Sequence, residues 1–244
     1  MNTSEPTVPP NSGLINVADI IVAPNAAFAR LRIVPTWGWA FLVASLLGIA
    51  GALLAEPAIA HAWDQYGPPQ LAVQVQNVDA AQRSKLIAQA TQASHLVFQF
   101  VWISVPIGLL IASLLQALVM MVANAIVHGE GTFSRFYALA MNVGVVGIGL
   151  SWFLIGIIAV VRGPGAYATQ TAVSGSVPGL ALLAPGAGLK LATFLSALNV
   201  TAIWSIALLA LGMMTIARLS SAAAWTTAII MLVLSSVIPA AFAR

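Results

Sequence analysis

The sequence predicts an all-α integral membrane protein: a five-helix bundle preceded by an N-terminal amphipathic helix at the membrane interface. Apolar residues make up 60% of the 244-residue chain and charged residues only 6%, whereas a soluble domain carries roughly 25% charged residues. Five apolar runs also reach the about 20 residues that a helix needs to cross about 30 Å of hydrocarbon. Because these runs are continuously apolar instead of alternating, they favour helices over a β-barrel.

The five predicted spans are separated by polar, glycine-rich or proline-rich stretches. The spans lie near residues 35–55, 96–127, 136–161, 191–217 and 222–242. The second run is longer than a crossing requires, so we expect it to tilt, to kink at Pro106 or to protrude at one end. Residues 1–13 are expected to form a flexible polar tail.

The connection between the first two spans, residues 56–95, is predicted to be a polar extramembrane loop. Its Asp64–Pro69 string contains glycine and two prolines, which indicates a turn. From about Val78, polar and apolar residues alternate with helical spacing, so an amphipathic helix is expected to start at Asn77 or Asp79 and to run into the second span.

The segment 14–34 is predicted to form one or two helices on the membrane surface. Asn25 is the expected cap of a second short helix, and Arg30 and Arg32 are expected near lipid phosphates. Pro35 is expected to open the first span. Trp37 and Trp39 then stand where aromatic side chains anchor a helix at the interface. The alternative is a flexible tail whose apolar residues pack against the bundle.

The connection 162–190 is rich in glycine and proline and has no charge between Arg162 and Lys190. We expect an irregular loop that dips into the interfacial zone. The alternative is a re-entrant segment, which needs protein or water beside it to satisfy its backbone groups.

Several function classes are excluded by the residues that the chain lacks. Nine dispersed Lys and Arg and a net charge of +3 cannot form the dense basic patch of a nucleic-acid-binding protein. There is no cysteine and no His-Glu-x-x-His motif, and His61, His95 and His128 lie at or outside the span ends. We therefore expect no enzymatic activity, no metal site and no cofactor.

Small and polar residues recur every four positions in the first two spans. Ala44, Gly48 and Ala52 follow Ala40 in the first span, and the second span carries Ser104, Gly108, Ala112, Gln116, Asn124 and His128 on one row. Such ridges let helix backbones approach closely, so they are predicted to pack the bundle or to form a self-association face. Gly48→Leu or Gly108→Leu is accordingly expected to disturb folding or association.

An alternative interpretation gives the buried polar residues a ligand. Asn142 and Asn199 in the third and fourth spans, with Gln116 and Asn124, would then line a route for a small neutral or lipid-like solute. In that case the chain is a permeation or transport protein.

The turn between the second and third spans is the most compact polar feature. Gly129 and Gly131 permit a tight reversal, and Thr132 is the expected cap of the third span. Arg135 lies beside aromatic residues and is predicted to anchor at the lipid interface.

Three short motifs resemble the Yip (Ypt-interacting protein) family. They are Pro24-x-x-x-Phe28, Pro35-Thr36-Trp37 and Gly129-x-Gly131-x-Phe133, and the resemblance covers about Val17 to Arg244. It implies a bacterial five-span protein that has a cytoplasmic N-terminus and no enzymatic activity. It also implies association with other membrane proteins or with itself. Eukaryotic relatives are linked to small GTPases and vesicle traffic, which bacteria lack, so no particular partner is implied.

Orientation is predicted from the cations that flank the spans. Arg30, Arg32, Arg135 and Arg218 fall on the N-terminal side, and Arg83, Lys85, Arg162, Lys190 and Arg244 on the other. Four against five gives no bias. The pair Arg30 and Arg32 lies close to the first span, however, and this favours a cytoplasmic N-terminus in a bacterial cytoplasmic membrane.

Overall fold

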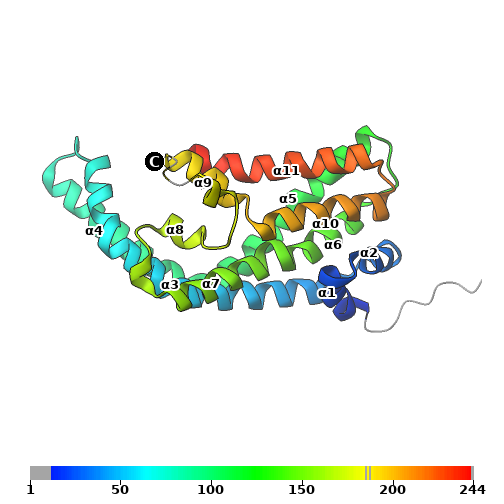
Figure 1. The fold of residues 1–244 in the computed structure, drawn as a ribbon, viewed down its shortest axis with the longest axis horizontal. Helices are drawn as coiled ribbons and strands as arrows, with labels where there is room; N and C mark the ends of the chain where they lie inside the picture. Colours follow the sequence, from blue (N-terminus) through cyan, green and yellow to red (C-terminus); the bar gives the residue numbers. More distant parts are fainter. Residues whose placement is uncertain (1–11, 185, 187, 243–244) are drawn as a thin grey trace, which may run out of the picture.

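The computed structural model of the chain describes residues 12–184, 186 and 188–242, and these residues form an all-α bundle (Figure 1). Within these ranges no strand is present, and the isolated bridge between Gly179 and Asn199 is the only β-type pairing. The predicted tail, residues 1–13, lies outside the described residues except for Ser12 and Gly13, which begin the first helix.

The helices reverse direction from one crossing to the next. In chain order they are α1 (Ser12–Val22), α2 (Pro24–Ile33), α3 (Gly38–Gln74), α4 (Ala80–Leu96), α5 (Val101–Ile126), α6 (Phe133–Gly144), α7 (Ser151–Arg162), α8 (Gln170–Ser174), α9 (Leu189–Ala197), α10 (Val200–Ala217) and α11 (Ser221–Phe242). Short 3-10 turns form η1 (Val97–Phe100), η3 (Pro164–Ala166) and η4 (Leu180–Leu183), while the π-helix η2 (Val145–Leu150) joins α6 to α7. As a result, α1, α2 and the α5–α6 and α10–α11 turns lie at one end of the bundle, and the α3–α4 hairpin lies at the other (Figure 1).

Among the described residues, four helical stretches are long and apolar enough to cross a membrane, not the five predicted. They are Gly38–Gln74, Ala80–Ile126, Phe133–Arg162 and Val200–Ala217. The predicted fifth span corresponds to helix α11, which is apolar over Ser221–Val237 and continues to Phe242. The predicted fourth span, 191–217, is interrupted between α9 and α10, so that only α10 has spanning length.

Helix α3 corrects the predicted boundaries of the first span and of the 56–95 loop. It begins at Gly38, three residues after Pro35, and it continues for 37 residues through Pro57, Pro68 and Pro69. The predicted turn at 64–69 does not form. The fixed φ of proline is compatible with a helix, so each proline removes one backbone hydrogen bond but does not force the chain to reverse. The reversal comes instead after Gln74, at residues 75–79.

Helix α4 starts as predicted and merges with the second span. Asp79 is its N-cap, and the carboxylate accepts hydrogen bonds from the backbone N–H groups of Ala81 and Gln82. The chain then stays helical from Ala80 to Ile126. Helix α4, which precedes the predicted second run, protrudes together with the end of α3 as a hairpin beyond the bundle (Figure 1).

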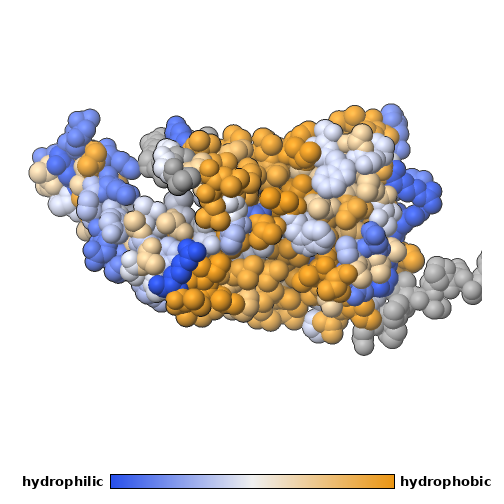
Figure 2. All heavy atoms as spheres, in the orientation of Figure 1, coloured by the Kyte–Doolittle hydropathy of each residue, from blue (hydrophilic) through white to orange (hydrophobic). Residues whose placement is uncertain are grey.

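The surface of the bundle is banded. On the face that Figure 2 shows, hydrophobic residues cover most of the middle, and hydrophilic residues gather on the α3–α4 hairpin and at the opposite end. A hydrophobic band between two polar ends, together with four helices of spanning length, is compatible with a multi-pass membrane protein.

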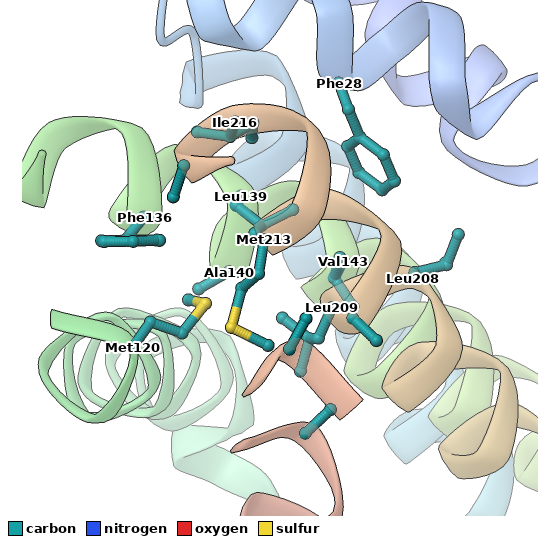
Figure 3. Packing of buried hydrophobic residues seen from close by; sticks show 14 of the residues in the cluster. Phe28, Met120, Phe136, Leu139, Ala140, Val143, Leu208, Leu209, Met213 and Ile216 are labelled. Carbon is teal, nitrogen blue, oxygen red and sulfur yellow. The ribbon is translucent and has the colours of Figure 1, made fainter. Parts of the chain in front are cut away.

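The core lies where α2, α5, α6, α10 and α11 meet. Phe28 from α2 and Met120 from α5 contribute to one buried cluster with Phe136, Leu139 and Met213 (Figure 3). Helix α2 thus packs against the bundle. This agrees with the alternative given for segment 14–34, except that the segment is helical instead of a flexible tail. Its N-cap is Ala23, followed by Pro24, so Asn25 is not the cap.

Helix α1 has its polar side toward the protein. Its buried residues are Ser12, Asn16 and Ile20, spaced one turn apart, while the exposed side presents apolar side chains, namely Leu14, Ile15, Ile21 and Val22. An exposed apolar face at the end of a hydrophobic band is typical of a helix that lies at a lipid interface.

The 162–190 connection folds back onto the bundle. Tyr167, Val173 and Val177 are buried in a cluster with Ile155 of α7 and Ala55 of α3. Farther along, Leu180 and Val200 make backbone hydrogen bonds that join the loop to the break between α9 and α10. The loop is therefore irregular, as predicted, but it contains short helical turns and a packed apolar side.

Candidate functional site

A polar network, which we call the N-terminal latch, joins α1 and α2 to the start of α3 and to α6. The Arg30 guanidinium forms an ion pair with Asp19, and its Nε donates to Asn16 Oδ1 at 2.7 Å. Asn16 Nδ2 donates to Thr36 Oγ1 at 3.2 Å, and Asn142 Nδ2 donates to the Thr36 carbonyl at 2.9 Å. Helices α1 and α2, the connection that follows α2, and the distant helix α6 are thus joined by one chain of hydrogen bonds.

The latch corrects the role predicted for Arg30. Its side chain is only 20% exposed, because it pairs with Asp19 inside the protein instead of reaching toward lipid phosphates. Arg32 is more exposed and lies 4.0 Å from Glu130, which also pairs with Arg218 at 3.1 Å. These residues form an exposed charged surface at the latch end of the bundle.

The other predicted interface residues remain at this end. Trp37 and Trp39 are 41% and 50% exposed, and Arg135 is half-buried in the first turn of α6. The Trp37 ring packs edge-on against Tyr137, with their centroids 5.6 Å apart. Exposed tryptophans beside the hydrophobic band are placed as the aromatic residues of a membrane interface are.

The predicted polar residues of α5 serve its C-terminal turn. Asn124 is buried, and its side chain exchanges hydrogen bonds with the backbone of Gly131. His128 is exposed and has a positive φ of 54° just after α5 ends. Gln116 is half-buried two turns earlier. Asn124 and His128 therefore belong to the α5–α6 reversal, and Gln116 does not.

The structure does not bring the four predicted amides together. Asn142 belongs to the latch, Asn124 to the α5–α6 turn, and Asn199 to the N-terminus of α10 at the opposite end. Because each of these three bonds to nearby backbone, they do not line a common polar route. The geometry therefore gives no support to permeation along Gln116, Asn124, Asn142 and Asn199.

Asn199 supports the break in the fourth predicted span. Its Oδ1 accepts from the backbone N–H of Ala202 at 3.0 Å and from Thr201 Oγ1 at 2.7 Å. The Thr201 hydroxyl also lies 3.0 Å from Ser151 Oγ, directly after the π-helix η2. A helix that starts inside the protein needs such partners, because its first N–H groups have none within the helix.

Asn199→Ala is expected to lower the free energy of unfolding by about 1–2 kcal/mol, because it removes a buried cap and a hydroxyl partner together. Thermal unfolding followed by circular dichroism in mild detergent measures this. Asn77→Ala, which changes an exposed residue of the α3–α4 hairpin, is the control and should leave unfolding unchanged. Equal melting of both variants would contradict the role of Asn199.

A glycine seam, formed by Gly51, Gly149 and Gly156, brings α3 into backbone contact with η2 and α7. A Cβ added at Gly156 would lie 2.4 Å from the Gly51 carbonyl oxygen, and one at Gly51 would lie 2.2 Å from the Trp152 carbonyl carbon. At Gly149 the added Cβ would meet Ala44 Cα at 2.9 Å. Only glycine permits these approaches.

The predicted packing residues divide into two groups. Ala44, Gly48 and Ala52 are buried on α3. Gly108 and Ala112 on α5 are not: Gly108 is exposed, and a Cβ added there would meet nothing within 4 Å. The predicted second ridge therefore makes no close contact at Gly108, because α5 approaches α3 through the Val105 side chain, which lies beside Gly48.

A groove with small side chains lies between α5 and α11, and we call it the α5–α11 groove. Its volume is about 610 Å³. Leu118, Val122 and Ile230 are exposed beside it, and its small residues are Ala123, Ala222, Ala223, Thr226 and Thr227.

In the part of the chain that the structure describes, no three His, Asp or Glu side chains form a group that could hold a metal ion.

The bundle belongs to the class of all-α folds that a multi-pass membrane protein has. Comparison with family models, with curated proteins and with solved structures gave no match to this chain. Its function is therefore inferred from its own residues and surfaces.

Proposed function

We propose that the chain is a non-enzymatic, Yip-type membrane protein that acts as an adaptor or assembly component. It would hold another membrane protein, or a second copy of itself, by helix packing. The observation that carries this proposal is the α5–α11 groove, which is apolar, lies between two apolar helices and contains alanine and threonine residues.

The chemistry of the groove suits a partner helix. Lipid tails are as apolar as leucine, so helices associate in membranes through close van der Waals packing and hydrogen bonds. Ala123, Ala222 and Ala223 allow close approach of a backbone. The Thr226 hydroxyl is exposed and can bond to a partner's polar group, whereas the Thr227 hydroxyl already donates to the Ala223 carbonyl.

Two further features support the Yip-type organisation. Two short N-terminal helices precede the first crossing, and Pro24 opens the second of them, where the resemblance places its first motif. We also propose that the latch end is cytoplasmic, in a bacterial cytoplasmic membrane, with α11 as a fifth crossing. Arg32, Arg135 and Arg218 lie at this end, near the helix ends where cytoplasmic cations act on orientation.

Single-cysteine crosslinking tests the groove, because the natural chain has no cysteine. Thr226→Cys is expected to give a crosslinked product of defined mass with a bifunctional thiol reagent in native membranes. Val160→Cys is the matched control: Val160 is 58% exposed on α7, away from the groove, and should give no such product. A product of twice the 25.2 kDa chain mass identifies a second copy.

Ala223→Trp in the Thr226→Cys background is the second control. A bulky ring in the groove should remove the product without unfolding the bundle, because Ala223 is partly exposed. Equal crosslinking from Thr226→Cys and Val160→Cys, or none from either, would contradict the proposed role.

A further inference from the structure

Two adjoining chambers lie between the protruding part of α3 and the helices around it. The first, the apolar chamber, has a volume of about 680 Å³ and lies between α3, α4–α5 and α7. The second, the polar chamber, has about 440 Å³ and lies between the end of α3 and α8. Trp63 and Gln170 line both, so the two spaces adjoin each other. Volumes of this size are typical of ligand pockets.

The apolar chamber is at the depth of lipid tails. Its walls include Ala52, Val105, Gly108 and Trp152, and Ala52 lies roughly 21 Å along α3 from Gly38 at about 1.5 Å per residue. With about 30 Å of hydrocarbon beginning at Gly38, the Ala52 end of this chamber lies among acyl chains and its Trp63 end lies beyond them. An apolar space at this depth accepts a hydrocarbon chain without loss of hydrogen bonds.

The polar chamber is at the depth of lipid headgroups. Trp63 lies about 38 Å along α3 from Gly38, beyond the hydrocarbon, where tryptophan is enriched. Gln70, Gln74 and Gln170 line the chamber, and among the described residues their side-chain amides make no hydrogen bond with protein. With Tyr66 and Thr171, they supply both donors and acceptors for a ligand.

The lining of both chambers contains no ionisable acid or base other than the Tyr66 phenol. No described Lys, Arg or His side chain lines either chamber, so a phosphate group would find no cation to pair with there. A headgroup that bonds to amides and hydroxyls but carries no charge is the one that these walls can satisfy.

We propose that the two chambers bind one neutral lipid of the diacylglycerol class, with an acyl chain in the apolar chamber and the hydroxyl-bearing headgroup among the glutamines of the polar chamber. The amphiphile enters from the leaflet that faces the α3–α4 hairpin. This site is separate from the α5–α11 groove and does not depend on the proposed assembly role.

Photolabelling in phosphatidylcholine nanodiscs tests the proposal with a photoreactive diacylglycerol as the probe. Saturable labelling of peptides from α3 and α5 is expected. Gly108→Leu should lower the labelling on the order of tenfold, because leucine replaces several bound methylene groups. Its added Cβ meets nothing within 4 Å, so the bundle should still fold. Gly38→Leu, whose added Cβ is equally free at the other end of α3, is the matched control and should leave labelling unchanged.

Two further arms separate a specific site from annular lipid. Gln170→Leu should weaken labelling by diacylglycerol and leave labelling by a photoreactive fatty-acid methyl ester unchanged, because only the headgroup contact is lost. Unlabelled diacylglycerol should compete, whereas phosphatidylglycerol should not. If Gly108→Leu failed to fold, Ala93→Phe at the exposed wall of the apolar chamber would serve in its place. Labelling that survives in the folded chamber variant, or equal competition by phosphatidylglycerol, overturns the proposal.

Discussion

Gly156→Ala is expected to destabilise the bundle strongly, and Gly156→Leu to prevent it from folding. The first Cβ alone would lie 2.4 Å from the Gly51 carbonyl oxygen and 2.9 Å from Gly51 Cα. These are backbone atoms of a packed helix, so α3 and α7 must separate. Overpacking costs typically about 1–3 kcal/mol, and here we expect the upper end for alanine and more for leucine. Thermal unfolding in mild detergent, with size-exclusion profiles, measures the loss.

Gly108→Leu is the matched control for the glycine seam. It makes the same change inside a spanning helix, but nothing lies within 4 Å of the added Cβ, and leucine has the higher helix propensity. Its melting temperature should equal or exceed that of the natural chain. If Gly108→Leu and Gly156→Leu lost stability equally, backbone contact at the glycine seam would not be what holds α3 against α7.

These two glycines show what the sequence could predict about packing. The spacing of small residues predicted a close-packed side of α3, and Ala44, Gly48 and Ala52 are buried in the structure. Gly108 has the same spacing but faces open space. A row of small residues shows only that close approach is allowed, and which rows meet depends on the tertiary arrangement. The seven-residue spacing of Gly149 and Gly156, two helical turns on one face, was a usable signal for the seam.

Helix boundaries were predictable where a cap determines them and not where prolines occur. Asp79 could be predicted as a start of α4, because a carboxylate just before a helical pattern typically caps the first backbone N–H groups of the helix. Glycine and two prolines at residues 64–69 predicted a turn, but α3 continues through Pro68 and Pro69. The helical φ of proline and packing against the neighbouring helix α4 keep the chain helical there. The tie between Trp63 Nε1 and Thr91 Oγ1, 3.2 Å apart, holds the hairpin together.

For the candidate sites, the sequence indicated the residue types but not their partners. Asn124, Asn142 and Asn199 are buried polar residues, and each needed a hydrogen bond. That Asn142 bonds to the Thr36 carbonyl, 106 positions away, depends on how the crossings assemble. The two chambers could not be predicted from the sequence either, because their walls come from several separate elements, namely α3, α4–α5, α7 and α8.

Arg30→Ala is expected to release α1 and α2 from the bundle. The change leaves the Asp19 carboxylate, 24% exposed, without its ion pair and Asn16 Oδ1 without a donor. Breaking a fully buried pair costs about 3–5 kcal/mol and losing a surface pair about 0–1 kcal/mol. The partial burial of this pair places the loss at about 2 kcal/mol. Hydrogen exchange of the backbone amides of residues 12–33 should therefore accelerate by about thirtyfold.

Arg32→Ala is the control that distinguishes the loss of the Arg30–Asp19 ion pair from the loss of an arginine side chain on α2 in general. Arg32 is two residues away on the same helix, is 36% exposed and lies 4.0 Å from its acidic neighbour, so its removal should change exchange by less than about threefold. In Arg30→Ala combined with Asp19→Ala, part of the loss should return, because no unpaired carboxylate remains. Strictly additive losses, or equal effects of the two arginine variants, would show that Phe28 and Leu31 hold the N-terminal helices by apolar packing alone, since both are fully buried in the core.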